Sequence, residues 1–122
     1  MSGLGLALGI AAAGGLGAAV RHLVDTSIPD RIRARFPWGI MLINLTGSFA
    51  LGLLAGLALD HPLARVAAVG FLGGYTTFST ASLDSVKLFA ARRYAAALWN
   101  GPGMLVLSTA LSVLGIVLVR SA

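Results

Sequence analysis

The sequence contains no cysteine, which excludes disulfide bonds and thiolate metal sites. Charged residues are also scarce. They make up 11% of the 122 residues, whereas a soluble domain carries about 25%. The sequence also lacks a motif that pairs a nucleophile with a base, a phosphate-binding loop and a cluster of metal ligands. We therefore expect neither an enzyme nor a soluble domain.

Apolar residues dominate the chain instead. They make up 57% of it, and the mean hydropathy is +0.90. They gather in four segments, each close to the ~20 residues that a helix needs to cross a bilayer. These segments cover approximately residues 4–24, 38–59, 66–90 and 95–119. Because the linkers are short, the sequence predicts an all-α membrane protein. It would form a single transmembrane domain over residues 1–122 with four transmembrane helices.

The third segment has an unusual composition for a membrane helix. Its residues 70–82, GFLGGYTTFSTAS, combine three glycines with five serine and threonine hydroxyls. Irregular backbone at membrane depth is tolerated only where it is buried in protein or lines a watery cavity, so such a break predicts an ion or substrate site. Small residues also let helices pack closely. We expect a helix broken near the membrane midplane, and both explanations remain open at this point.

Polar residues inside the other spans are further candidate ligands. Arg21, near the end of the first span, either reaches the lipid headgroups or draws anions towards a vestibule. Asn44, in the second span, either bonds to a neighbouring helix or contacts a ligand, because its amide both donates and accepts. In the fourth span, polar residues spaced by four lie on one helix face and predict a polar track. The members of this stripe are Asn100, Met104, Ser108 and Ser112.

Carboxylates are nearly absent from the predicted spans. Asp84, in the second half of the third segment, is the one acidic residue inside them. A proton-coupled transporter or a cation pump normally needs an intramembrane carboxylate. His22 and His61 lie at span edges, where a solvated role is favoured over metal binding. Hydroxyls, amides and an arginine therefore favour an anion over a cation as the transported species.

Four stretches of the sequence carry a resemblance to a known family. They are GGLGAAVRH (residues 14–22), PWGIMLINLTGSFALG (37–52), GFLGGYTTFSTAS (70–82) and SVLG (112–115). In this order they resemble the motifs of the small bacterial fluoride channels, the Fluc or CrcB family. The third motif is long and unusual, and the resemblance covers nearly the whole chain.

This resemblance implies a passive, fluoride-selective channel in the bacterial inner membrane, built from two antiparallel subunits with two pores. Its role would be to relieve fluoride toxicity. Asn44 would supply amide donors, and Ser108 or Ser112 a hydroxyl. Phe78 would present its ring edge, which carries the positive end of the aromatic quadrupole. The residues implied to line the pore are Arg21, Asn44, Thr77, Phe78, Ser79, Ser108 and Ser112.

The resemblance also implies a structural sodium ion at the dimer centre. It would bind the backbone carbonyls of Gly73 and Thr76, since a broken helix frees carbonyls for a cation. Its positive charge would offset the repulsion from anions in the flanking pores.

The chain departs from the family pattern at two positions. Ala81 stands where the family usually has a second Phe, and Asp84 replaces the usual Glu. A homodimer would then have two altered pores, whereas a heterodimer with a paralogue that keeps both Phe residues would have one complete pore. Seven Lys and Arg residues lie on the side of the first and third linkers, and two on the opposite side. Such a bias sets orientation, so homodimer and heterodimer both remain open.

Two other classes of protein are alternatives to a self-sufficient channel. One is a non-conducting or half-functional subunit of a heterodimeric channel, which Ala81 makes plausible. The other is a small multidrug transporter, which is also a four-span antiparallel dimer. Such transporters need a carboxylate in the first span, and residues 4–20 contain none, so this class is disfavoured.

Overall fold

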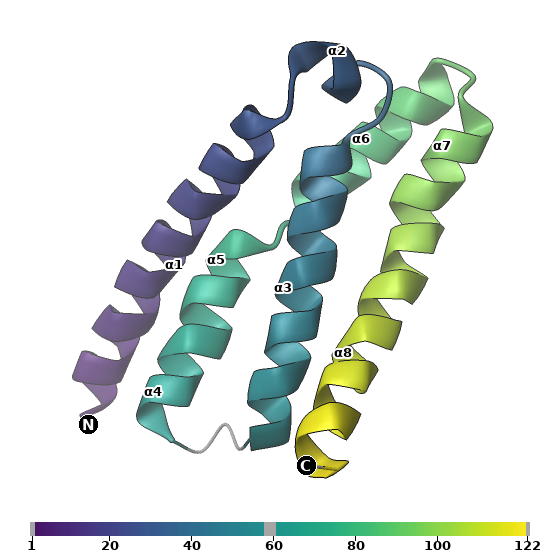
Figure 1. Ribbon diagram of the computed structural model, residues 1–122. Coiled ribbons are helices and arrows are strands. Elements are labelled where there is room, and N and C mark those ends of the chain that lie inside the picture. The colour runs from purple at the N-terminus through teal and green to yellow at the C-terminus, as the bar shows by residue number, and fades with distance from the viewer. Residues whose placement is uncertain (1, 58–60, 122) are drawn as a thin grey trace.

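Long helices run side by side along the molecule, and both termini lie at the same end (Figure 1). The computed structural model describes residues 2–57 and 61–121, and within this part of the chain all regular structure is helical. In chain order the elements are α1 (Gly3–Ser27), α2 (Asp30–Arg33), α3 (Trp38–Leu57), α4 (Pro62–Arg65), η1 (Val66–Leu72), α5 (Gly73–Tyr75), α6 (Phe78–Ala90), α7 (Tyr94–Leu98), η2 (Trp99–Gly103) and α8 (Met104–Ser121). The two elements η1 and η2 are π-helical.

Within the described residues, three helices are long and apolar enough to cross a membrane. They are α1, α3 and the continuous run Tyr94–Ser121, which joins α7, η2 and α8. They correspond to the first, second and fourth apolar segments of the sequence. The first helix continues to Ser27, where the hydroxyls of Thr26 and Ser27 bond to carbonyls of the preceding turn. The last residues of the second predicted segment, 58 and 59, lie outside the described residues.

The third apolar segment is divided into two helical parts. The first part, α4, η1 and α5, ends at Tyr75, and the second part, α6, begins at Phe78. Between them Thr76 and Thr77 are extended, with ψ angles of 157° and 122°. The interruption therefore falls inside the glycine- and hydroxyl-rich stretch.

Glycines bring two pairs of helices into close contact. A Cβ on Gly74 of α5 would lie 2.0 Å from the Gly14 carbonyl oxygen of α1, and one on Gly52 of α3 would lie 2.1 Å from the Ser112 carbonyl oxygen of α8. Gly73 differs, because a Cβ there would meet nothing within 4 Å. Close packing thus explains Gly74 but not Gly73, although the two are adjacent.

Paired charges hold the connections at the end opposite the termini. The guanidinium of Arg33 contacts the carboxylates of Asp25 and Asp30, and its hydrogen bond to Asp30 raises the pKa of Arg33. Arg93, just before α7, donates to the Ala34 carbonyl over 3.4 Å. The linker after α1 is thereby tied to the turn between α6 and α7.

Candidate functional site

The side chain of Asn44 closes the interruption in the third segment. Its Oδ1 accepts from the backbone N–H of Thr77, and its Nδ2 donates to the backbone carbonyl of Thr77, both over 2.8 Å. A backbone N–H can only donate and a carbonyl can only accept, so these two bonds fix the orientation of the amide. Asn44 therefore replaces the helical partners that Thr77 lacks. We refer to this reciprocal pair as the Asn44–Thr77 clamp.

The same arrangement takes two carbonyls out of the helical hydrogen-bond pattern. In an unbroken helix the N–H groups of Thr77 and Thr80 would bond to the carbonyls of Gly73 and Thr76. Here the Thr77 N–H goes to Asn44, and the Thr80 N–H goes to the Thr77 hydroxyl over 3.2 Å. The carbonyls of Gly73 and Thr76 thus lose their usual donors. These are the two carbonyls that the family resemblance implied as sodium ligands.

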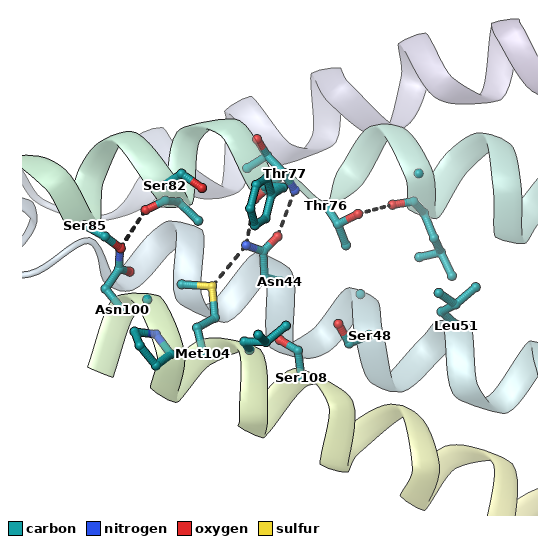
Figure 2. Close-up of a pocket in the computed structure, with 18 of the residues that line it drawn as sticks. Asn44, Ser48, Leu51, Thr76, Thr77, Ser82, Ser85, Asn100, Met104 and Ser108 are labelled. Atoms are coloured by element: carbon teal, nitrogen blue, oxygen red, sulfur yellow. Dashed lines mark hydrogen bonds between the residues drawn. The ribbon is translucent and has the colours of Figure 1, made fainter. Parts of the chain in front are cut away.

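An open cavity of about 810 Å³ lies beside the clamp, between α3, the two parts of the third segment and α8. Figure 2 shows polar side chains from these elements around it. Most of the lining surface is apolar, and only a minority of the lining residues have polar side chains. Those with polar side chains are Asn44, Ser48, Thr76, Thr77, Ser82, Ser85, Asn100 and Ser108.

Phe78 stands at the cavity with its ring mostly uncovered. The residue is 84% exposed, the largest value among the exposed bulky apolar residues of the described chain. It is the first residue of α6, directly after the clamp. Its ring edge is therefore free to meet an anion or a second protein. The neighbouring Ser79 does not line the cavity, but its hydroxyl lies 3.4 Å from that of Thr77.

The two serines of α8 have different surroundings. Ser108 lines the cavity, whereas Ser112 donates to the Ser48 carbonyl of α3 over 2.9 Å. Residues spaced by four drift about 40° around an α-helix at each step, which carries Ser112 away from the cavity. Asn100 and Met104 remain on the cavity side with Ser108. Asn100 lies within the π-helical η2, and Met104 directly follows it. Pro102, which has no N–H to donate, lies inside η2 and accounts for its irregular turn.

Asn100, which also lines the cavity, joins the fourth span to α6. It is 1% exposed, and its Nδ2 donates to the Ala81 carbonyl over 3.1 Å and to the Ser85 hydroxyl over 2.9 Å. Ala81 is itself buried, at 7% exposure. Reasoning from the sequence did not single out Ser85. Its position four residues after Ala81, on the buried side of α6, is the signal that would have found it.

The structure does not bring every candidate residue to the cavity. Arg21 lies on α1 and is absent from the cavity lining, as is Asp84 on α6. Asn44, Thr77, Phe78 and Ser108 are brought together there. Conversely, the sequence placed Met104 only in the polar stripe, whereas its sulfur accepts a hydrogen bond from Asn44 over 3.1 Å.

Comparisons with known proteins agree on one family. The family model described as "CrcB-like protein, Camphor Resistance (CrcB)" matches residues 8–117. The chain is 47% identical over 113 residues to a protein of Leifsonia xyli subsp. xyli named "Fluoride-specific ion channel FluC 1", which covers 89% of this chain and 82% of the relative. It is 43% identical over 108 residues to "Fluoride-specific ion channel FluC 2" of Mycobacterium bovis, covering 88% and 86%. It is 42% identical over 118 residues to "Fluoride-specific ion channel FluC" of Nitrobacter winogradskyi, covering 93% and 94%.

Proposed function

The chain belongs to the CrcB-like family, and we propose that it forms a fluoride-selective channel through which fluoride leaves the cell down its electrochemical gradient. It is an integral protein of the bacterial cell membrane, as its apolar helices and its bacterial relatives support. The relatives are named as ion channels and not as enzymes. The proposed benefit to the cell is relief from fluoride toxicity.

The polar lining of the cavity carries this proposal. Fluoride is small and tightly hydrated, so a pore must replace its water with hydrogen-bond donors. The lining offers the Asn44 amide and the Ser108 hydroxyl, and it contains no Asp or Glu among the described residues. The exposed Phe78 ring adds an edge of positive potential. A cavity that presents donors without carboxylates suits an anion better than a cation.

We further propose that the functional unit is an antiparallel dimer of four-span subunits, in which the divided third segment crosses the membrane. Phe78 and Gly73 are both exposed beside the cavity, and a second subunit would cover them. In this proposal the Gly73 and Thr76 carbonyls, deprived of their helical donors, bind a structural sodium ion at the dimer centre. The partner is a second copy or an oppositely oriented paralogue.

Efflux of fluoride from liposomes that contain only this chain tests the proposal. Chloride efflux is measured in parallel, and protein-free liposomes give the background leak. Rapid efflux of fluoride without chloride is the expected result. Absence of fluoride efflux from folded, reconstituted protein would contradict a self-sufficient channel.

Ala81 supports a second candidate function, that of one subunit in a heterodimeric channel. Its small side chain is buried and offers no aromatic edge to a pore. Under this alternative the chain alone conducts weakly or not at all, and conduction returns on co-reconstitution with a paralogue. An Ala81→Phe variant separates the candidates, because it should restore conduction to the chain alone only if the missing ring is the defect.

A further inference from the structure

The hydrogen bond from Asn44 to the sulfur of Met104 differs in kind from the two bonds of the Asn44–Thr77 clamp. The Asn44 Nδ2 carries two hydrogens, of which one goes to the Thr77 carbonyl and the other to Met104 Sδ. Figure 2 shows the sulfur and the carbonyl on separate sides of the amide nitrogen. Both N–H groups of the Asn44 amide are therefore in use, and an anion can accept from the amide only by displacing one partner.

The partner that can be displaced is Met104. Thr77 is 7% exposed, and removing Asn44 from it would leave a buried N–H and a buried carbonyl without partners. A thioether sulfur, in contrast, is a weak acceptor, and its loss leaves no strongly polar group unpaired. A charged anion is a much stronger acceptor than sulfur. The exchange of sulfur for fluoride is therefore the favourable one.

The position of Met104 allows this exchange without movement of the backbone. It is the first residue of α8, it lines the same cavity as Phe78 and Ser108, and it is 4% exposed. Methionine has three rotatable side-chain bonds and adapts to irregular spaces. Rotation of the side chain would move the sulfur from the amide while α8 stays in place.

We propose that Met104 is a positioning residue for the anion site: its sulfur holds the second Asn44 N–H towards the cavity and yields it to an entering fluoride ion. Met104 thereby sets the fluoride concentration at which the site fills. This inference rests on the proposed function, because the competing anion is fluoride.

The full-length chain with 13C-methyl-labelled methionine tests this exchange directly. The chain has three methionines, and Met41 provides an internal control. Met41 is buried in the same apolar cluster as Met104. Reconstituted protein is titrated with sodium fluoride or sodium chloride at constant total sodium. We expect the Met104 methyl resonance to shift and saturate with fluoride, while the Met41 resonance stays in place and chloride has no effect.

A pair of matched variants measures the competition. Met104→Leu keeps the volume and removes the acceptor, so the fluoride concentration that half-saturates the Asn44 side-chain amide resonance should fall about fivefold, as expected for loss of one weak competing bond. Met41→Leu should leave it unchanged. Equal half-saturation in wild type and Met104→Leu would overturn the inference. If Met104→Leu does not fold, the wild-type methyl titration decides alone.

The liposome assay separates failure of this inference from failure of the proposed function. If the chain conducts fluoride but the Met104 methyl resonance does not shift with fluoride, the proposed role of Met104 is overturned and the proposed channel function stands. A fluoride-dependent methyl shift without efflux supports the exchange site and contradicts a self-sufficient channel. Absence of both overturns both.

Discussion

The α3–α8 contact and the interruption at Thr76–Thr77 are built from similar residues but use them in opposite ways. At the contact, Gly52 brings two intact helices together so closely that a Cβ would lie 2.1 Å from a backbone oxygen. At the interruption, Gly73 faces open space, and the backbone bonds of Thr77 pass to a side chain. Small and hydroxyl residues therefore allow close helix packing at the α3–α8 contact. At the interruption, they accompany backbone groups that leave the helical hydrogen-bond pattern. The difference lies in what each residue faces.

The largest effect is expected from a methyl group placed in a close glycine contact. Gly74→Ala would set a Cβ 2.0 Å from the Gly14 carbonyl oxygen, and the overpacking should lower the free energy of unfolding by about 3 kcal/mol. In the dissociated subunit, Gly73→Ala should stay within about 1 kcal/mol of wild type, because within one chain nothing obstructs the new methyl. Unfolding in denaturing detergent, followed by tryptophan fluorescence, measures both.

Gly15→Ala is the control for this pair, since its Cβ also meets nothing within 4 Å. It lies on α1 beside Gly14, far along the chain from the interruption. If Gly74→Ala were as stable as Gly15→Ala, close approach of the backbones would not be what the glycine provides.

The next largest effect is expected from removal of the clamp. Asn44→Leu leaves the N–H and carbonyl of Thr77 without partners, which should cost about 2 kcal/mol of unfolding free energy and reduce fluoride efflux at least about tenfold. Thr109→Val is the control, because the Thr109 hydroxyl is exposed and bonds only within its own helix. Wild-type stability in Asn44→Leu would show that the interruption does not depend on Asn44.

Two serine variants on α8 should separate packing from conduction. Ser112→Ala removes the bond to the Ser48 carbonyl, so it should cost about 1 kcal/mol and leave efflux unchanged. Ser108→Ala should leave stability unchanged and slow fluoride efflux about threefold, through loss of one donor. The opposite result, with efflux sensitive only to Ser112→Ala, would place the ion path outside the cavity that Ser108 lines.

The smallest effect is expected at Arg92, a residue with a side chain in a backbone conformation that favours glycine. Arg92, between α6 and α7, has a φ of 62°, a left-handed conformation that costs a residue with a side chain roughly 1 kcal/mol. Arg92→Gly should therefore raise the unfolding free energy by about 0.5 kcal/mol, since glycine flexibility offsets part of the gain. Ala91→Gly, at a φ of −81°, should instead lower it. A shift of the same sign in both variants would contradict this explanation.

The sequence predicted much of the helical pattern because hydropathy and segment length largely determine where a chain can be buried in lipid. Its glycine- and hydroxyl-rich stretch also indicated where the irregular backbone lies. The sequence position could not predict which of the two glycines packs against α1 and which faces open space. Gly73 and Gly74 are adjacent on one helical turn and differ only in the direction that each faces. That difference depends on where α1 lies.

The partners of the polar residues were less predictable. Asn44 and Thr77 are separated by 33 positions, and no local pattern joins them. An isolated amide in one apolar span and an interrupted backbone in another each need a hydrogen-bond partner. That shared need is the sequence feature that could have suggested their pairing. The four-residue stripe predicted Ser108 and Ser112 alike, whereas helical drift separates them, and the bond to the Met104 sulfur has no signature in the sequence.

The clamp also has a consequence for the order in which the chain can be built into a membrane. The two parts of the third segment span 14 residues (62–75) and 13 residues (78–90), so each is about 20 Å long and falls short of the ~30 Å hydrocarbon core. Neither part can complete a crossing alone, and their junction is costly in lipid until its backbone groups are bonded. Asn44 belongs to the preceding helix, so the ribosome delivers it before Thr77. In the proposed four-span arrangement, the third segment therefore enters the membrane after Asn44, the hydrogen-bonding partner of its junction.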